Sequence, residues 1–410
     1  SANQDVAEAA ARVEEARALA GLAQADRWPQ IDLSASASRT RLSGDSALLP
    51  PGIPLETSRF RIAPTVSFDA DFWGRLRRLS AAARAELLSS EEGRRHVRLG
   101  VVSEVAEAYF DLVALDRQLV IARETLDSRR ESARLQRLRF QAGTISQLDL
   151  AQAEAEVAAT EAAVPVLERQ ARQTEDLLAV LLGRMGGTVE RNAALDGLVL
   201  PIVPLGLPSQ LLSRRPDVVA AEQRLVAANA RIGAARAAYF PSIVLTGAAG
   251  SESSALSNLL TSGTGIWQAA LSLVQPIFNA GKTGRRVEAA RARQRQELAA
   301  YTRTVQNAFA DVEDALVARR TGAAEREALA RQVSDLANAR RLARLRYEAG
   351  NASYLEVLDA ERNLFRAQLE LTRARRGELA ASVNLFRALG GGWEDGHAGS
   401  AQAPRAALAR

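Results

Sequence analysis

A seven-residue segment in the first half of this chain returns in the second half in almost the same form. RLRFQAG at residues 137–143 reappears at 344–350 as RLRYEAG, 207 positions later, and the segments that follow share a pattern, TISQLDLAQAEAE and NASYLEVLDAERN. An earlier segment, ARALAGLAQADRWPQI at 16–31, aligns with ANARIGAARAAYFPSI at 228–243, a shift of 212. Because repeated supersecondary units fold alike, we predict one architecture built twice.

Each repeat is predicted to contain a helix, two strands, a long helix, a tight turn and a returning helix. The first repeat covers 1–190 and the second 209–390, joined by a linker at 191–208 and followed by a tail at 391–410 that we expect to be flexible. The opening helix of each repeat ends where aromatic residues meet proline, which cannot continue a helix. These motifs are Trp28-Pro29 and Tyr239-Phe240-Pro241.

Four segments after these prolines alternate apolar and polar residues with a period of two, which indicates two-faced strands. They are 29–42 and 58–73 in the first repeat and 242–250 and 265–278 in the second. Lipid-facing strands of a membrane barrel alternate in the same way. The apolar residues expected to face lipid are Phe60, Ile62, Phe68, Leu245 and Leu273. A soluble hairpin packed on helices has the same alternation, so both interpretations stay open at this point.

The number of strands limits the membrane interpretation. Four strands cannot close a barrel, because about eight are the practical minimum. A membrane barrel would therefore need several chains, and three copies would supply twelve strands.

The segments after each strand pair predict very long helical hairpins. The outgoing helices, from about 75 to 140 and from about 284 to 347, would each be roughly 90 to 100 Å long at about 1.5 Å per residue. Shorter returning helices follow at 146–182 and 353–389, with tips near 141–148 and 348–355. Heptad-like apolar spacing favours coiled-coil packing. The fold class is therefore mainly α with a small β part, and a soluble coiled coil is the alternative.

Composition and motifs argue against an enzyme, a cofactor or a metal site. The chain has no cysteine, and 53 Lys+Arg against 48 Asp+Glu leave a net charge of only +5, so nucleic acid is not an expected partner. His96 and His397 have no second histidine at metal-ligand spacing. Gly-Lys-Thr at 281–283 lacks the earlier glycine of a phosphate loop, since residue 276 is Pro276.

Several segments together resemble the TolC-like outer-membrane efflux family, in particular its OprM-type, NodT-like branch. The most specific is LPSQLLSRRPDVVAAEQRLVAANARIGAARAAYFPSI at 207–243. The others are SFDADFWGRLRR at 67–78, RLRFQAGTISQLDLAQAE at 137–154, QPIFNAGK at 275–282, RYEAGNASYLEVLDAERNLFRAQLEL at 346–371 and VNLFRALGGGW at 383–393. The resemblance extends over nearly the whole chain.

The resemblance implies a homotrimeric, passive exit duct in the bacterial outer membrane. Each protomer would give four strands to a twelve-stranded β-barrel that is continued by a periplasmic α-barrel. The turns at Gly143 and Gly350 would lie at the periplasmic tip and contact a periplasmic adaptor and an inner-membrane pump. Glycine suits such tight turns.

The same resemblance places a periplasmic gate in the second repeat. Its residues are Leu355, Asp359, Glu356, Tyr347 and Arg362, of which the last two would hold the tip closed by polar contacts. A carboxylate repeated by threefold symmetry would form a ring of negative charge that selects cations, and Asp359 is the expected member. Judged by spacing alone, Asp359 is an ordinary solvated charge near a helix start. Some relatives have Arg where this chain has Ala352, which puts one ion pair of the gate in doubt.

Other questions stay open from the sequence. OprM-type relatives carry a lipidated N-terminal Cys and a helical segment before the point where this chain begins, so lipid anchoring cannot be assigned. A periplasmic structural or adaptor coiled coil of an export complex is the alternative function, and a nucleic-acid-binding coiled coil is a third.

Overall fold

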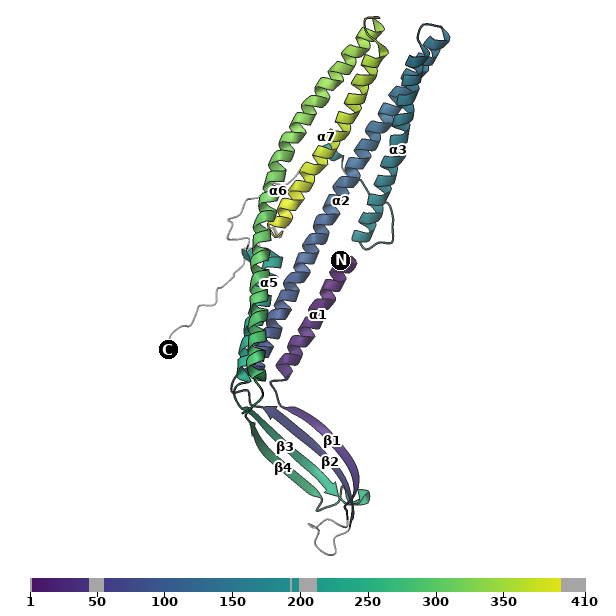
Figure 1. Ribbon diagram of the computed structural model, residues 1–410. Coiled ribbons are helices and arrows are strands. Elements are labelled where there is room, and N and C mark those ends of the chain that lie inside the picture. The colour runs from purple at the N-terminus through teal and green to yellow at the C-terminus, as the bar shows by residue number, and fades with distance from the viewer. Residues whose placement is uncertain (1, 44–54, 192–193, 199–211, 392–410) are drawn as a thin grey trace. The chain divides into compact units, whose positions relative to one another are not determined.

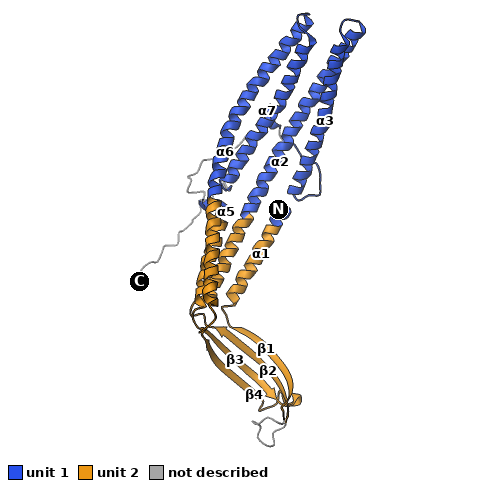
Figure 2. Ribbon diagram, viewed as in Figure 1, with its two compact units in different colours: residues 1–7, 95–216, 306–410 blue, residues 8–94, 217–305 orange. Residues whose placement is uncertain are grey.

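The computed structural model describes residues 2–43, 55–191, 194–198 and 212–391 (Figure 1). Long helices and one four-stranded antiparallel sheet account for most of them. Two compact units draw on both predicted repeats (Figure 2): unit 1 contains residues 1–7, 95–216 and 306–410, and unit 2 contains 8–94 and 217–305. The predicted linker lies mostly, and the predicted tail almost entirely, outside the described residues.

The two halves of the chain contain matching elements. The first half has α1 (Gln4–Ala25), β1 (Gln30–Arg41), β2 (Glu56–Asp69), α2 (Arg75–Gln141) and α3 (Gln147–Leu181). The second has α5 (Pro216–Ala237), β3 (Ser242–Ser253), β4 (Gly265–Val274), α6 (Lys282–Glu348) and α7 (Tyr354–Ala388). α2 and α6 have 67 residues each, and α3 and α7 have 35 each, as a duplication requires. Neither these helices nor α1 and α5 have the length and apolar composition needed to cross a membrane.

Several predicted element ends were wrong. The second strand, expected to reach 73, ends at Asp69, because the carboxylate of Asp71 accepts hydrogen bonds from the backbone N–H groups of Leu76 and Arg77 and caps the start of α2 (3.0 and 2.8 Å). The fourth strand ends at Val274 rather than 278, two residues before Pro276. α5 begins at Pro216 rather than 209, and proline fits the first turn of a helix. Conversely, β3 runs three residues longer than predicted.

The sheet joins the two halves of the chain through its central pair. Its order is β1-β2-β3-β4, every neighbouring pair is antiparallel, and β2 pairs with β3. β1 and β4 are therefore the edge strands. An aromatic contact at the base of the sheet also links the halves: the rings of Trp73 and Phe240 stack at 4.4 Å, and Trp73 Nε1 donates to the carbonyl of Pro241 (2.9 Å).

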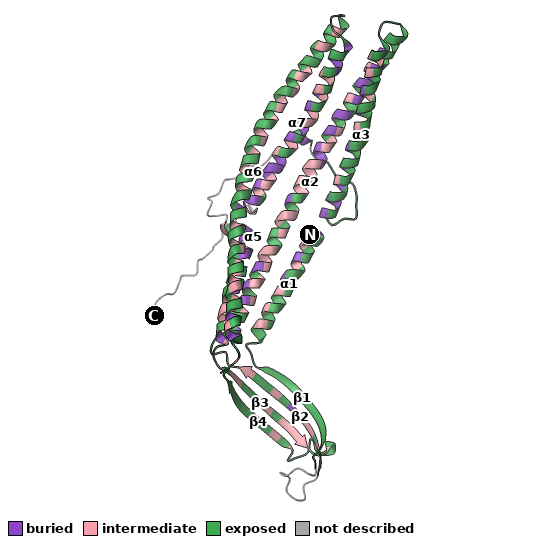
Figure 3. Cartoon of the chain, viewed as in Figure 1, coloured by how far each residue is buried: buried purple, intermediate pink, exposed green. Residues whose placement is uncertain are grey.

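Within unit 1 the helices bury small apolar clusters between pairs of helices (Figure 3). Leu112 of α2 packs with Leu178 of α3, and Leu385 of α7 packs with Ala315 of α6. Much of each helix surface stays exposed, and the part of α6 from residue 316 to residue 348 has no buried residue. A long helix needs tertiary packing of an apolar face for most of its stability, so α6 gains less of that packing than α2 within one chain.

The RRPDV motif at 214–218 has a structural explanation in unit 1. Arg215 is buried, and its guanidinium donates to the carbonyls of Ala308 and Ala388 (3.4 and 3.2 Å) and pairs with Asp311 (2.9 Å). Ala388 is the last residue of α7, where backbone carbonyls lack partners within the helix. One arginine therefore joins the end of α7 to α6.

Candidate functional site

The sheet has one mainly apolar and one mainly polar face. Residues opposite each other in an antiparallel pair point to the same face. The register pairs Ala37 with Phe60, Ala35 with Ile62, Phe68 with Leu245, and Ile243 with Leu273. All five residues predicted to face lipid therefore share one face. The opposite face includes Asp32, Ser34, Ser36, Ser38, Thr65, Ser67, Thr246, Gln268 and Ser272.

Both the apolar face and the two edges of the sheet are uncovered in the single chain. On the apolar face Ile31, Leu33 and Trp267 are 74, 71 and 82% exposed. An exposed apolar surface of this kind marks a contact with a partner or with lipid. The edge strands β1 and β4, 12 and 10 residues long, each present one side of their backbone for pairing. The apolar face and the two edge strands are thus three surfaces of the sheet that are free to contact another molecule.

The tip turns of the two hairpins have the same backbone structure. Gly143 and Gly350 adopt φ of +71° and +75°. Gly143 donates to the carbonyl of Phe140 and Thr144 to that of Arg139, both at 2.9 Å. At the second tip Gly350 and Asn351 make the equivalent bonds to Tyr347 and Arg346. This pattern is a Schellman motif, in which glycine takes the left-handed position without steric cost.

Tyr347 connects the two hairpins close to these turns. Its hydroxyl hydrogen-bonds the side-chain amide of Gln136 on α2 at 3.1 Å. The guanidinium carbon of Arg139 lies 5.2 Å from the centroid of the Tyr347 ring, within range of a cation–π contact. The Tyr354 ring lies 5.3 Å away, and burial raises the pKa of Tyr354 to about 12. Tyr347 therefore makes a polar contact with the other hairpin, through a residue that the sequence did not single out.

Arg362 makes the second connection, through a buried carboxylate. Its Nε donates to Glu156 of α3 at 2.6 Å, and this hydrogen bond raises the pKa of Arg362. Glu156 is only 8% exposed and also pairs with Arg129 of α2 at 2.8 Å. Arg129 donates to the hydroxyl of Thr160 (2.5 Å), and its guanidinium carbon lies 5.5 Å from the ring centroid of Phe365. α2, α3 and α7 thus meet at one buried carboxylate.

The other three predicted gate residues have no such connection to the first hairpin. Leu355 is 50% exposed. Glu356 pairs with Arg346 at 3.3 Å, within its own hairpin. Asp359 is exposed and accepts a hydrogen bond from Asn363, one turn along α7, at 3.2 Å. The structure therefore separates the five residues into two that contact the neighbouring hairpin and three that remain near the surface of their own.

Sequence reasoning missed Glu156, Arg129 and Gln136. One signal was available for Glu156: it lies three residues after Ala153 and four before Thr160, so all three share one face of α3, and all three are buried. A carboxylate within a buried stripe needs a cationic partner, because Asp and Glu are rarely buried unpaired. Which arginine supplies that partner depends on tertiary packing.

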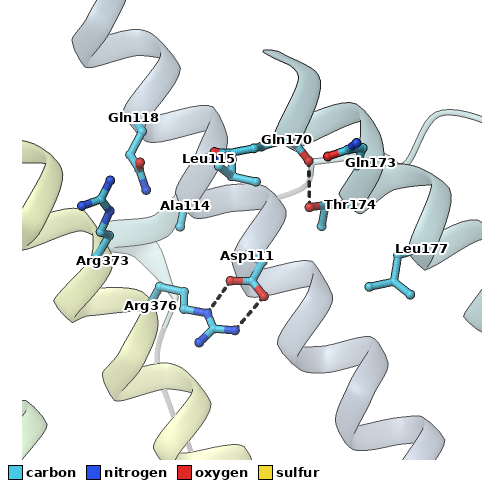
Figure 4. Close-up of a pocket in the computed structure, with 10 residues that line it drawn as sticks. All are labelled: Asp111, Ala114, Leu115, Gln118, Gln170, Gln173, Thr174, Leu177, Arg373 and Arg376. Atoms are coloured by element: carbon cyan, nitrogen blue, oxygen red, sulfur yellow. Dashed lines mark hydrogen bonds and ion pairs between the residues drawn. The ribbon is translucent and has the colours of Figure 1, made fainter. Parts of the chain in front are cut away.

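A polar hollow lies between α2, α3 and α7 farther along unit 1 (Figure 4). Its volume is about 610 Å³. Arg376 of α7 donates to Asp111 of α2 at 2.6 Å on one side, and Gln118, Gln170 and Thr174 contribute to the lining. Among the described residues, no three His, Cys, Asp or Glu side chains gather as metal ligands.

Known proteins with similar sequences and structures are outer-membrane efflux components. The profile of the family described as outer membrane efflux protein matches residues 1–184 and 207–391. The chain is 39% identical over 394 residues to the cation efflux system protein CusC of Escherichia coli, covering 96% of this chain and 84% of that protein. It is 39% identical over 393 residues to the toluene efflux pump outer membrane protein TtgI of Pseudomonas putida, covering 95 and 83%. A crystal structure of CusC aligns with a TM-score of 0.88 at 38% identity, over 95% of this chain and 90% of that one.

An open sheet with an apolar and a polar face, on a chain of long helical hairpins, is the make-up of an outer-membrane efflux channel protein. The chain belongs to the outer membrane efflux protein family. This confirms the family that the sequence motifs indicated. The adaptor and nucleic-acid-binding interpretations have no comparable support.

Proposed function

We propose that this chain is one of three identical subunits of a passive duct through the outer membrane. The observation that carries the proposal is the sheet, with an uncovered apolar face and two unpaired edges. Unpaired backbone groups in lipid cost several kcal/mol each, so a sheet that enters a bilayer must close. Because the number of strands per chain is even, β4 of one copy meets β1 of the next in an antiparallel sense.

Three copies suit passage of a solute better than two. An eight-stranded barrel has an interior just wide enough to be filled by side chains, whereas wider barrels enclose a channel. Twelve strands, four from each of three chains, would place the polar face toward water and the face with Phe68, Leu245 and Leu273 toward lipid. A closed threefold ring of head-to-tail contacts leaves no edge strand.

The tips of the hairpins form the gate in this proposal. Threefold symmetry would bring three copies of Asp359 around one axis, with Leu355 one turn away as an apolar constriction. The contacts of Tyr347 with Gln136 and of Arg362 with Glu156 would act as latches that hold the two hairpins of one chain together. Opening would require both latches to rearrange.

The tip turns at Gly143 and Gly350 are the proposed contact with a periplasmic adaptor, which would connect the duct to an inner-membrane pump. The duct would contribute no chemistry, so the pump would supply the energy. The names of two relatives refer to cations and to toluene, although both are 39% identical to this chain. Two relatives that are equally similar to this chain are thus named for very different solutes. This favours a general exit path whose cargo is chosen by the pump.

The barrel assignment is tested by paired arginine substitutions on one strand. Leu245→Arg would place a charge on the lipid face, which costs about 2–4 kcal/mol near the bilayer midplane. Thr246→Arg, one residue along on the polar face, is the matched control. We expect Leu245→Arg to reduce the heat-modifiable trimers recovered from outer membranes and Thr246→Arg to leave their yield near wild type. Equal yields for the two variants would contradict the assignment.

The gate assignment is tested by ion selectivity in planar bilayers. Asp359→Ala should lower the preference for cations, because it removes three carboxylates from the proposed ring. Its repeat counterpart Gln152, 207 positions earlier, provides the control substitution Gln152→Ala. An intact Asp359→Ala trimer with unchanged selectivity would remove Asp359 from the gate.

A further inference from the structure

The polar face of the sheet carries a cluster of charged residues with more positive than negative charges. Arg59 and Arg61 of β2 flank Glu252 of β3, which lies opposite Arg61 in the register. Arg59 Nε is 3.4 Å and Arg61 Nη1 is 3.9 Å from the Glu252 carboxylate. Two guanidinium groups therefore share one carboxylate at ion-pair distances that are long for hydrogen bonds, which leaves a net charge of about +1 per chain.

The other charges on this face do not cancel that excess. In the four strands they are Asp32 and Asp69, and Asp69 is paired with Arg75 at 2.6 Å. Asp32 lies opposite Thr65, four residues along β2 from Arg61. Four residues correspond to about 13 Å along a strand, more than the screening length of about 10 Å at 0.1 M salt.

We propose that Arg59 and Arg61 form a positive ring in the lumen of the duct, where they favour anionic solutes and slow cationic ones. This inference rests on the proposed trimer, in which three copies place six guanidinium groups and three Glu252 carboxylates at one level, a net charge of about +3. Rings of arginine or lysine select anions in pores. The solutes that this ring would favour are small anions with carboxylate, sulfonate or phosphate groups, which pair well with guanidinium.

The opposite face of the same sheet supplies a control with the same composition. Arg39 and Arg41 of β1 share Glu56 of β2 at 2.7 and 3.7 Å. These three residues lie on the face with Phe60 and Ile62. They have the same two-to-one ratio of charges, but on the outside of the proposed barrel they would not contact permeating ions.

The experiment compares Arg59→Gln/Arg61→Gln with Arg39→Gln/Arg41→Gln in the full chain. Each trimer is inserted into a planar bilayer of uncharged lipid, and the reversal potential is measured in a KCl gradient whose dilute side is about 0.1 M, where Asp32 is screened from Arg61. Both variants are prepared with and without Asp359→Ala, so that a carboxylate ring at the gate does not mask the effect. We expect the chloride-to-potassium permeability ratio to fall about twofold or more for Arg59→Gln/Arg61→Gln and to stay at the wild-type value for Arg39→Gln/Arg41→Gln.

The outcomes separate this inference from the proposed function. Conducting trimers whose selectivity is the same in wild type and in Arg59→Gln/Arg61→Gln would overturn the positive ring and leave the duct intact. A change confined to Arg39→Gln/Arg41→Gln would also overturn it, because the lumen would then be the other face. A wild-type protein that forms neither trimers nor channels would refute the duct itself.

Discussion

The two hairpin tips in unit 1 have the same backbone turn but different side chains at matching positions. Both outgoing helices end at a glycine with φ near +70° and make the same pair of hydrogen bonds. Glu156 in the first hairpin is buried between two arginines, whereas its counterpart Asn363, 207 positions later, hydrogen-bonds Asp359. The duplication thus kept the turn geometry, while the side chains diverged into a buried ion-pair cluster around Glu156 on α3 and a local Asp359–Asn363 contact on α7.

A second pair of counterparts differs in the same way. Glu154 of α3 is exposed and pairs with Arg137 at 2.6 Å. Its counterpart Glu361 of α7 is partly buried, and burial raises its pKa even though Arg129, Arg340 and Arg344 act in the opposite direction. One repeat therefore keeps this carboxylate in water, and the other holds it among the packed helices.

The largest predicted difference between the repeats concerns Glu156. Glu156→Gln removes the carboxylate that Arg129 and Arg362 share, and breaking a buried ion pair costs about 3–5 kcal/mol. Asn363→Ala, at the counterpart position, should cost less than about 1 kcal/mol because Asn363 makes one exposed contact. Thermal unfolding of both variants, followed by circular dichroism in detergent, measures the difference. Equal melting temperatures would mean that the buried cluster does not stabilise the tips.

The shared turn geometry predicts equal effects of glycine substitution at the two tips. Gly143→Ala and Gly350→Ala should each lower stability by about 1–2 kcal/mol, because each alanine would be held in the left-handed region. A Cβ has open space at both positions, so backbone strain is the main cost.

Gly93, inside α2, provides the control for these turns. A Cβ also has open space there, but φ is not positive. Gly93→Ala should therefore raise stability by about 0.5–1 kcal/mol. Denaturant unfolding of the three variants compares them, and a loss at only one tip would show that the two turns are not energetically equivalent.

A smaller difference is expected at the first residues after the turns. Ser146 forms a capping box with Asp149, whereas Ser353 makes no side-chain hydrogen bond to the start of α7. Ser146→Ala should cost about 1 kcal/mol, and Ser353→Ala only a small fraction of that. Protection of the first amides of α3 and α7 from hydrogen exchange provides the measurement. Similar losses of protection in both helices would contradict the difference in capping.

The smallest predicted effect is a dependence on pH that comes from Glu361. The pKa of Glu361 is higher in the folded chain than its ordinary value of 4.5, so its contribution to stability is complete below pH 4.5 and is lost as pH rises through the folded pKa. Glu361→Gln should abolish this part of the pH dependence and raise stability at pH 7. Glu154→Gln should retain it, since Glu361 is untouched. Melting temperatures measured from pH 4 upward distinguish the two variants, and identical profiles would refute the role of Glu361.

The extents of the long helices and the faces of the strands could be predicted from the sequence. The helix expected at about 284–347 spans Lys282–Glu348, because a long run of helix-forming residues without proline that is followed by glycine has clear limits. The alternation in the strands also placed Phe60, Phe68 and Leu273 on one face. Asp71 continued the same alternation, yet its carboxylate caps a helix, so a period of two could not locate the end of the strand.

The side-chain contacts between the two hairpins could not be predicted from the sequence, for a different reason. Arg362 and Glu156 are 206 residues apart, and the sequence offers Arg362 another carboxylate, Asp359, three residues earlier on its own helix. The choice among them depends on how α7 packs on α3 in three dimensions. The resemblance identified Arg362 as a polar contact but could not supply Glu156, Arg129 or Gln136.

The pairing of β2 with β3 has a consequence for assembly. If each half of the chain were a separate polypeptide with two strands, a twelve-stranded wall would need six molecules and six intermolecular boundaries. Each fused chain makes one of those boundaries internally, at its β2–β3 pair, so three chains leave only three intermolecular boundaries. Each association avoided saves the loss of translational and rotational freedom, an estimated 4–15 kcal/mol at standard concentration. Gene duplication would thereby have halved the number of intermolecular boundaries in the wall.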